Sequence, residues 1–375
     1  MSDIITTYIL INGFCFFVFL FYGKILAKKG TFKEYYLASI FPILTYALTY
    51  GLRFGRDIDW NLYYFRYKAL GESLHNEDYE FLFSMLCHLF YNIGIPYYMF
   101  IFLQCAFLMF TILVFLRNFR QYLPFILPLL LPLISTNDCY IRWWFAFSFF
   151  ILSLNSYLHK NNAWALLWFL CAFFIHFGII VLAPIIAIVL MFATSFILSL
   201  SSFTFLINLS SQFLGLGLVG SGEKADIYLN STQDLINGDF GRLGLYERSI
   251  MNKIRPLIAF IPTVYFMRNY IDKIKYGIFF YNLFVIGAIL RPICLVEILD
   301  RYASSFAFFS CVVCGVYFYQ AYKNRNTQSL LYFIIAMLGL FVSVWPTLSL
   351  LWKTENVFDM MFIWDAGGRN YLPIR

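Results

Sequence analysis

Long runs of apolar residues, separated by short polar segments, follow one another along almost the whole chain. A helix needs about 20 apolar residues to cross a bilayer, and most of these runs come close to that length. Hydrophobic residues make up 61% of the 375 residues and charged residues 13%, whereas a soluble domain is about a quarter charged. The sequence therefore predicts an all-α, polytopic membrane protein that forms a single integral membrane domain over residues 1–375. About twelve transmembrane helices are expected, near residues 4–23, 36–52, 97–116, 122–136, 142–158, 163–180, 181–197, 198–214, 254–267, 276–293, 302–320 and 328–346.

Two segments depart from this pattern. Residues 79–92 are apolar but too short to span, so we expect a helix that lies on the membrane face or dips into it. Residues 215–253 are the longest polar stretch, and long loops with their own charge pattern are usually functional or disordered. We interpret them as a large outer loop that covers a cavity at the membrane face.

Lysines after the first apolar run set the predicted orientation. Cytoplasmic loops carry an excess of Lys and Arg, so this loop is placed in the cytoplasm and the N-terminus outside. Alternation of the spans then places most of the acidic residues on the outer side. The loops predicted to lie inside carry Lys24, Lys28, Lys29, Lys33, Arg117, Arg120, Lys160, Arg268, Lys273, Lys275, Lys323 and Arg325.

The loops predicted to lie outside carry mostly arginine, whereas the inner loops carry mostly lysine. Topology alone does not require arginine on the outer face. A guanidinium grips two phosphate oxygens at once, so this face suits a phosphate or diphosphate ligand. Its net negative charge argues against nucleic acid as a partner.

The polar stretch 53–68 follows directly on the apolar run 36–52 and contains two aspartates and several aromatic residues besides its arginines. If the helix continues through it, Arg53 and Arg56 share a face, and Asp57 steadies Arg53 from four residues away. Paired guanidiniums at a membrane surface would suit a diphosphate. The same composition is typical of an interfacial loop of snorkelling arginines and belt aromatics, and both interpretations stay open.

Further polar residues recur at the predicted outer ends of later helices. Arg142 begins one helix, with Asp138 as a possible partner four residues earlier. His176 lies in a predicted span, where a histidine is costly and is a functional hypothesis by default. The alternative is a histidine that packs against a neighbouring helix and is hydrogen-bonded there. The residues expected on the same face as Arg53 and Arg56 are Arg142, His176, Arg291, Asp300, Arg301 and Tyr302, and a cavity for a polyanion explains this set better than separate anchors do.

These residues resemble the landmarks of the EpsG family. The stretch from Arg53 through Asp57 to Tyr63 resembles a family signature in which an arginine, a glycine and an aspartate precede a tyrosine. The acidic segment that ends at Glu80 resembles the part that follows it. Later landmarks are similar to Ile141-Arg142, with Trp143 where a glutamine is common, to Phe174-Ile-His176-Phe, and to Asp300-Arg301-Tyr302.

The resemblance implies a function. EpsG proteins are similar to Wzy polymerases, which join undecaprenyl-diphosphate-linked oligosaccharide repeats into O-antigen, capsule or exopolysaccharide. It therefore implies a metal-independent glycosyltransferase of GT-C-like fold without a cofactor. Its place would be the bacterial inner membrane, with the active site facing the periplasm and the N-terminus periplasmic. Membrane lipids, a chain-length regulator and a flippase are the partners that such a role implies.

Roles for the candidate residues follow from this chemistry. A hydroxyl of one lipid-linked repeat would attack C1 of the sugar at the diphosphate end of the growing chain, and undecaprenyl diphosphate would leave. Cations would offset the charge that grows on the leaving diphosphate, and a base would take the hydroxyl proton. The diphosphate would be bound by Arg53, Arg56, Arg142 and Arg301, with Arg248, Arg291 and Tyr302 as further binding residues. The base would be His176 or Asp57, oriented by Asp59, and sugar rings would stack on Trp60, Tyr63 and Tyr64.

Three other classes stay open as alternatives. A transporter or flippase would need polar residues along a path across the bilayer, whereas here they crowd on one side. A membrane acyltransferase also uses an intramembrane histidine, but its acyl donor usually arrives from the cytoplasm. An O-antigen ligase-like glycosyltransferase uses the same donor and differs only in its acceptor.

Overall fold

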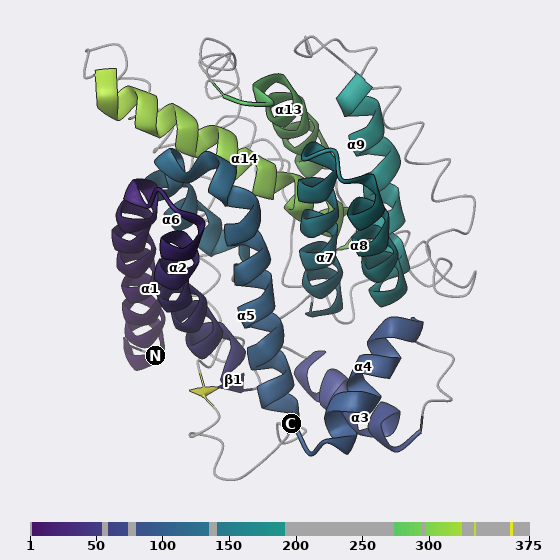
Figure 1. Cartoon of the computed structure of the whole chain (residues 1–375). Helices are drawn as coiled ribbons and strands as arrows, with labels where there is room; N and C mark the ends of the chain where they lie inside the picture. Colours follow the sequence, from purple (N-terminus) through teal and green to yellow (C-terminus); the bar gives the residue numbers. More distant parts are fainter. Residues whose placement is uncertain are drawn as a thin grey trace. The chain divides into compact units, whose positions relative to one another are not determined.

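The computed structural model describes residues 2–54, 59–73, 80–134, 141–191, 274–293, 297–324, 334 and 361–362. These residues are almost entirely helical, and the only strands among them are two residues long each, which confirms the all-α class (Figure 1). In chain order the elements are α1 Ser2–Lys28, α2 Phe32–Tyr46, the π-helical turn η1 Ala47–Gly51, β1 Arg53–Phe54, α3 Asp59–Glu72, α4 Phe81–Asn92, α5 Tyr97–Leu116, the 3-10 helix η2 Arg117–Tyr122, α6 Leu123–Ile134, α7 Ile141–Leu158, α8 Asn162–Ile175, the 3-10 helix η4 Phe177–Val181, α9 Leu182–Met191, α13 Gly277–Ile293, α14 Glu297–Asn324 and β2 Met361–Phe362.

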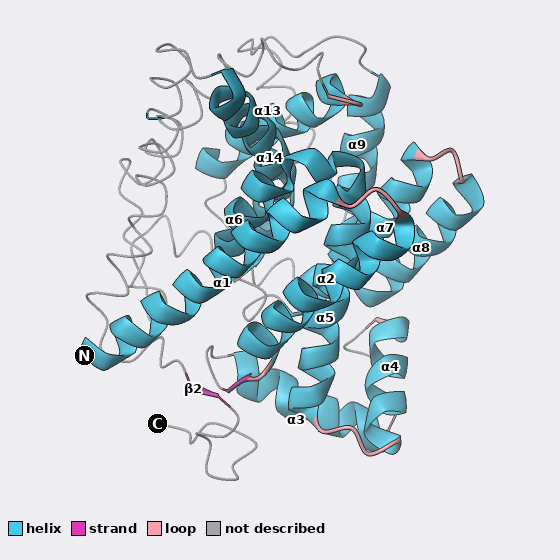
Figure 2. Cartoon of the chain, turned by 60° about the vertical axis from the view of Figure 1, so that its left-hand side comes forward, coloured by secondary structure: helices cyan, strands magenta, loops and turns pink. Residues whose placement is uncertain are grey.

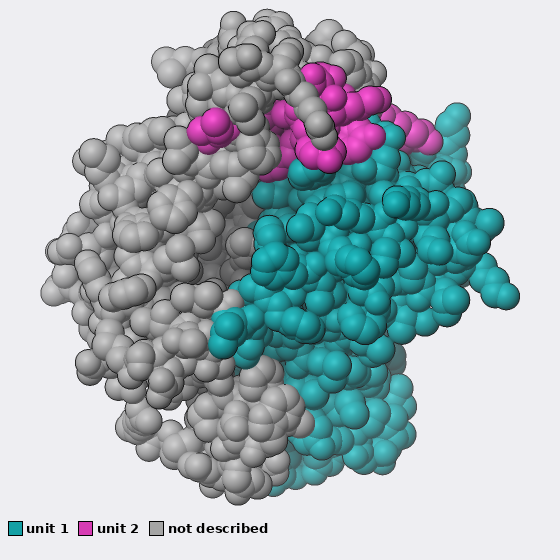
Figure 3. All heavy atoms as spheres, turned by 90° about the vertical axis from the view of Figure 1, so that its left-hand side faces the viewer, with its two compact units in different colours: residues 1–179, 349–375 teal, residues 180–348 magenta. Residues whose placement is uncertain are grey.

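The chain divides into two compact units, residues 1–179 with 349–375 and residues 180–348 (Figure 3). The first unit contains α1 to α8 and the strand pair, and the second contains α9, α13 and α14. In the second unit α13 packs against both α9 and α14. A single integral membrane domain stays a prediction.

Helix bounds follow the predicted apolar runs closely. The run predicted at 97–116 is α5, and its start is marked by Gly94 in the left-handed conformation at φ 80° and by Pro96 directly before the first helical residue. The short segment near 79–92 is the 12-residue helix α4. The predicted spans near 198–214 and 254–267, almost all of 328–346 and the loop 215–253 lie outside the described residues.

Two helical stretches of the described chain are long and apolar enough to cross a membrane, Leu10–Lys28 and the 35-residue stretch Tyr97–Leu131. Large apolar side chains also point outward in the first unit, among them Phe17 and Leu37, each 68% exposed. Apolar surface of this kind suits lipid better than water. The count of about twelve spans, the GT-C-like arrangement and the interfacial position of α4 stay predictions.

In the first unit α1 packs on α2 and α6, α5 packs on α2 and α7, and α7 packs on α8 (Figures 1 and 2). Two buried tyrosines tie α2 to its neighbours. The Tyr35 hydroxyl donates to the Leu113 carbonyl at 2.9 Å, and the Tyr46 hydroxyl donates to the Ile134 carbonyl at 2.7 Å. Because a buried hydroxyl is costly without a partner, these bonds fix the register of α2.

Two loops that were predicted to share the inner side lie together. Arg120, in the connection between α5 and α6, donates from Nη1 to the carbonyls of Lys29 (2.9 Å) and Gly30 (3.1 Å) after α1. The Arg117 guanidinium lies 4.5 Å from the ring centroid of Phe32. The two connections are therefore neighbours in the fold, and their place on the cytoplasmic side of a membrane stays a prediction.

The helix of the 36–52 run ends before the polar stretch, so the condition for a shared helical face is not met at Arg53, and Arg56 lies outside the described residues. α2 ends at Tyr46, one π-helical turn follows, and Arg53 then pairs with Phe362 in a short antiparallel strand pair. Gly51 allows the close approach to α5 here, since a Cβ on it would lie 2.6 Å from the Phe102 Cα. Close packing and strand pairing together override the helical continuation.

Candidate active site

Three helix ends meet in the first unit: the residue before the start of α4, the start of α7 and the end of α8. The start of α7 is fixed from α5, because buried Gln104 donates from Nε2 to the Ile141 carbonyl at 2.6 Å. The pairing of α7 with α8 is supported by Ser153, whose hydroxyl donates to the Ala165 carbonyl at 2.7 Å. These bonds fix the position of α7, which carries Arg142, relative to α5 and to α8, which ends just before His176.

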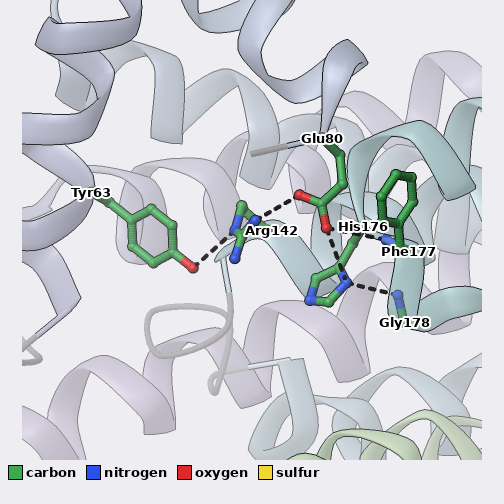
Figure 4. A network of polar contacts seen from close by, with 6 residues as sticks. All are labelled: Tyr63, Glu80, Arg142, His176, Phe177 and Gly178. Carbon is green, nitrogen blue, oxygen red and sulfur yellow. Dashed lines mark hydrogen bonds and ion pairs between the residues drawn. The ribbon is translucent and has the colours of Figure 1, made fainter. Parts of the chain in front are cut away.

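Arg142 is held by side chains from two other elements. Its Nη1 donates to Glu80 Oε2 at 2.7 Å, and its Nε donates to the Tyr63 hydroxyl of α3 at 3.4 Å (Figure 4). The side chains of Arg142 and Glu80 are 19% and 12% exposed, so the pair is largely shielded from water. A charge-assisted bond at this distance is among the stronger polar contacts in a protein. The expected partner Asp138 lies outside the described residues.

The second oxygen of Glu80 faces the end of α8. Oε1 accepts a hydrogen bond from the Phe177 backbone N–H at 3.2 Å and lies 3.7 Å from His176 Nδ1 (Figure 4). One carboxylate therefore links the predicted cation Arg142 to the predicted base His176.

His176 ends α8 in an extended conformation, with φ −155° and ψ 108°. Its Nδ1 accepts a hydrogen bond from the Gly178 N–H at 3.1 Å. A nitrogen that accepts carries no proton, so this arrangement corresponds to a neutral imidazole protonated on Nε2. The side chain is 16% exposed, and the Trp143 ring packs edge-on against it with centroids 5.4 Å apart.

The aromatic residues of α3 divide into two kinds. Trp60 is 7% exposed and packs edge-on against Tyr97 at 5.0 Å between ring centroids, so its ring is largely buried in this conformation, and its stacking on a sugar stays a prediction. Tyr63 and Tyr64 are half-buried, and Tyr63 contacts Arg142. Of the three rings predicted to stack on sugars, these two are the ones whose surface is in part accessible.

Arg53 is 1% exposed, and its guanidinium carbon lies 4.2 Å from the centroid of the Tyr50 ring. A cation over an aromatic face is a favourable contact, particularly where water is excluded. The guanidinium is thus part of the interior in this conformation, and diphosphate binding by Arg53 stays a prediction.

The other predicted site residues are placed only in part. Asp59 begins α3, Arg291 lies in α13 and Arg301 in α14, but the description does not extend to their side chains. Tyr302 of α14 is 5% exposed. Arg56, Asp57 and Arg248 lie outside the described residues. The structure therefore joins Arg142, His176 and Tyr63.

Glu80 is the residue that was missing from the predicted site. It lies 62 residues from Arg142 and 97 from Phe177, so no local spacing connects these groups. A signal was present nonetheless: Glu80 stands directly before an apolar helix, at the end of an acidic segment that resembles a family landmark. Within the described ranges, no group of three or more His, Cys, Asp or Glu side chains could hold a metal ion.

Fold and site together define a helical protein with two apolar stretches long enough to span a membrane, whose polar network joins a guanidinium, a carboxylate and an imidazole at the ends of three segments. The sequence model of the EpsG family matches residues 36–354, which is most of the chain. The protein therefore belongs to the EpsG family, a family of Wzy-like polysaccharide polymerases, and membership indicates a membrane enzyme of polysaccharide biosynthesis. No curated protein and no solved structure gave a match.

Proposed function

We propose that this protein is a Wzy-type polymerase that joins undecaprenyl-diphosphate-linked oligosaccharide repeats on the periplasmic face of the bacterial inner membrane. The observation that carries the proposal is the link through Glu80, because it brings a cation and a potential base, Arg142 and His176, to one carboxylate. Transfer of a sugar from a lipid diphosphate needs both groups near each other.

In the proposed reaction, the oxygen of the acceptor hydroxyl forms a bond to C1 of the donor sugar. The bond between C1 and the diphosphate oxygen breaks, and its electron pair leaves with undecaprenyl diphosphate. The hydroxyl proton passes to His176. Arg142 offsets the charge that grows on the diphosphate, and a guanidinium has five donors, enough to hold a carboxylate and a phosphate oxygen together.

Other cations complete the diphosphate site in this proposal. Arg53, Arg56, Arg248, Arg291 and Arg301 stay candidates for that role, with Tyr63 and Tyr64 beside the sugar. No metal ion takes part, so the reaction proceeds in the presence of a chelator.

Purified protein in lipid, supplied with an undecaprenyl-diphosphate-linked repeat and EDTA, tests the proposal. We expect a ladder of polymer and release of undecaprenyl diphosphate. Arg142→Ala and His176→Ala should each lower the rate about 100-fold or more, as loss of one charge-stabilising or proton-transfer group does. Arg120→Ala is the matched control, because Arg120 binds only loop carbonyls in its described contacts, and it should retain activity within about twofold. Folded wild-type protein that makes no polymer would reject the proposal.

A further inference from the structure

The contacts of His176 correspond to two different protonation patterns. The Gly178 N–H points at Nδ1 from 3.1 Å, which requires an unprotonated Nδ1 and leaves the proton on Nε2. Glu80 Oε1 lies 3.7 Å from the same Nδ1 and, as a carboxylate, attracts a proton there. One nitrogen cannot satisfy both neighbours at once, so Gly178 and Glu80 favour opposite tautomers.

The two tautomers differ in what they do for a substrate. With its proton on Nε2, the imidazole presents a donor on the side away from Glu80 and cannot take a proton there. With its proton on Nδ1, Nε2 becomes a lone-pair acceptor. A carboxylate that holds Nδ1–H also stabilises the imidazolium that forms when Nε2 is protonated.

Glu80 is well placed for this role because its own position is fixed. Oε2 is bound by Arg142 at 2.7 Å and Oε1 by the Phe177 N–H at 3.2 Å, so the carboxylate is held from two elements. Its side chain is 12% exposed, which limits screening by water. Its backbone lies before α4 and its side chain makes no cap bond to that helix, so the carboxylate is directed across the site.

We propose that, when substrate binds, Glu80 acts as a positioning residue that draws the His176 proton from Nε2, where the Gly178 contact places it in this conformation, to Nδ1, and so makes Nε2 the proton acceptor of the transfer reaction. This inference rests on the proposed function. The acceptor O–H bond breaks and its proton goes to Nε2, while the oxygen bonds to C1 and the diphosphate leaves with the electron pair of the broken bond. The imidazolium pairs with Glu80 until its Nε2 proton passes to water.

Kinetics of a double-mutant set separate this role from a structural one. Glu80→Gln keeps the shape but removes the charge, and its amide NH2 can turn toward Nδ1 and favour the inactive tautomer. We expect kcat to fall at least tenfold in the wild-type background and less than threefold in a His176→Gln background, because groups that act as a unit are not additive. In an Arg142→Lys background, Glu80→Gln should still lower kcat at least tenfold. Equal losses in all three backgrounds would overturn the proposal.

Two further measurements keep the test decisive. Magic-angle-spinning NMR of 15N-histidine-labelled wild-type protein with undecaprenyl diphosphate bound reports the protonated nitrogen, and the His176→Gln spectrum assigns the signal among the four histidines. We expect Nδ1–H in the wild type, and a pure Nε2–H signal would contradict the proposal even if Glu80→Gln failed to fold.

Tyr67→Phe, which removes a structural bond from the Tyr67 hydroxyl to the Ile95 carbonyl, is the control for general loss of packing and should leave the His176 signal unchanged. Polymer formation by the wild type alongside an unaffected Glu80→Gln would reject this inference and leave the proposed function intact.

Discussion

Glu80 Oε2 lies 2.7 Å from Arg142 Nη1 although the two residues are 62 positions apart in the chain. The contact joins the segment before α4 to the first turn of α7, and the other oxygen of Glu80 extends the connection to the turn after α8. A single ion pair therefore sets both the position of the candidate cation and the shape of the site.

The ion pair should contribute to stability as well as to activity. Glu80→Ala leaves a largely buried guanidinium without its carboxylate, and we expect a loss of about 1–3 kcal/mol in the free energy of unfolding. Arg142→Ala should cost a similar amount. The double variant should cost clearly less than the two losses added together, by roughly 0.5–3 kcal/mol, because each single change already removes the same contact. Thermal unfolding of the four proteins in one detergent measures this, and strictly additive losses would show that the pair is not coupled.

Arg142→Lys should fail to replace arginine. Lysine keeps the charge, but its single ammonium group cannot reproduce the two-sided contact of Nη1 with Glu80 and Nε with Tyr63. We expect at least a tenfold loss of polymer formation with stability closer to the wild type than that of Arg142→Ala. Tyr63→Phe removes only the 3.4 Å bond and should cause a smaller loss, about two- to fivefold. Polymer rates in membrane vesicles compare the variants, and full activity of Arg142→Lys would mean that charge alone suffices.

Gly51→Ala should destabilise the turn between α2 and the strand pair. A methyl group on Gly51 would lie 2.6 Å from the Phe102 Cα, and a backbone atom inside α5 has little room to move. Overpacking of this kind costs about 1–3 kcal/mol. Gly13→Ala is the control, because nothing lies within 4 Å of a Cβ there and alanine favours the helix. A lower melting temperature for Gly51→Ala only is the expected result, and equal melting temperatures would argue against the close contact.

The Cys87 thiol should resist alkylation while α4 stays packed. Burial raises the pKa of Cys87, and the nearby charge of Arg142 lowers it by less. Because the thiolate is the reactive form and a raised pKa keeps the thiol protonated, reaction with iodoacetamide at pH 8 should be far slower than for a free cysteine. The rate should rise when denaturant opens α4. Mass spectrometry of the peptide that contains Cys87 follows the reaction, with Cys87→Ala as the blank; rapid labelling of the native protein would show that α4 is not packed as described.

Helix positions could be predicted from the sequence because hydropathy and helix-ending residues are local properties. α5 starts and ends at the predicted residues, where Gly94 and Pro96 mark its beginning. The conformation of Arg53 could not be predicted this way, since β1 depends on a partner, Met361–Phe362, from the far end of the chain. The spacing of Arg53 and Arg56 is compatible with a helix, but Arg53 is in a strand because it pairs with Phe362.

In the candidate site, too, the individual residues could be predicted from local sequence, but their contacts with one another could not. Arg142 and His176 stood out because a charge or an imidazole next to an apolar helix is costly and therefore conspicuous. Their connection through Glu80 was not visible, because it arises only when α4 packs against α8 and the start of α7 comes close. Helical periodicity also suggested Asp138 as a carboxylate partner of Arg142; Asp138 lies outside the described residues, and the described partner Glu80 comes from a distant segment.

The glycolipid ladder of a strain that lacks the chromosomal gene tests the central claim most directly. The strain is complemented in turn with the wild type, Arg142→Ala, His176→Ala and the control Tyr67→Phe, at matched protein levels in the membrane. We predict a full ladder with the wild type and with Tyr67→Phe, and lipid-linked single repeats without polymer for the two site variants. A full ladder from Arg142→Ala and His176→Ala would contradict the assignment of this network as the active site.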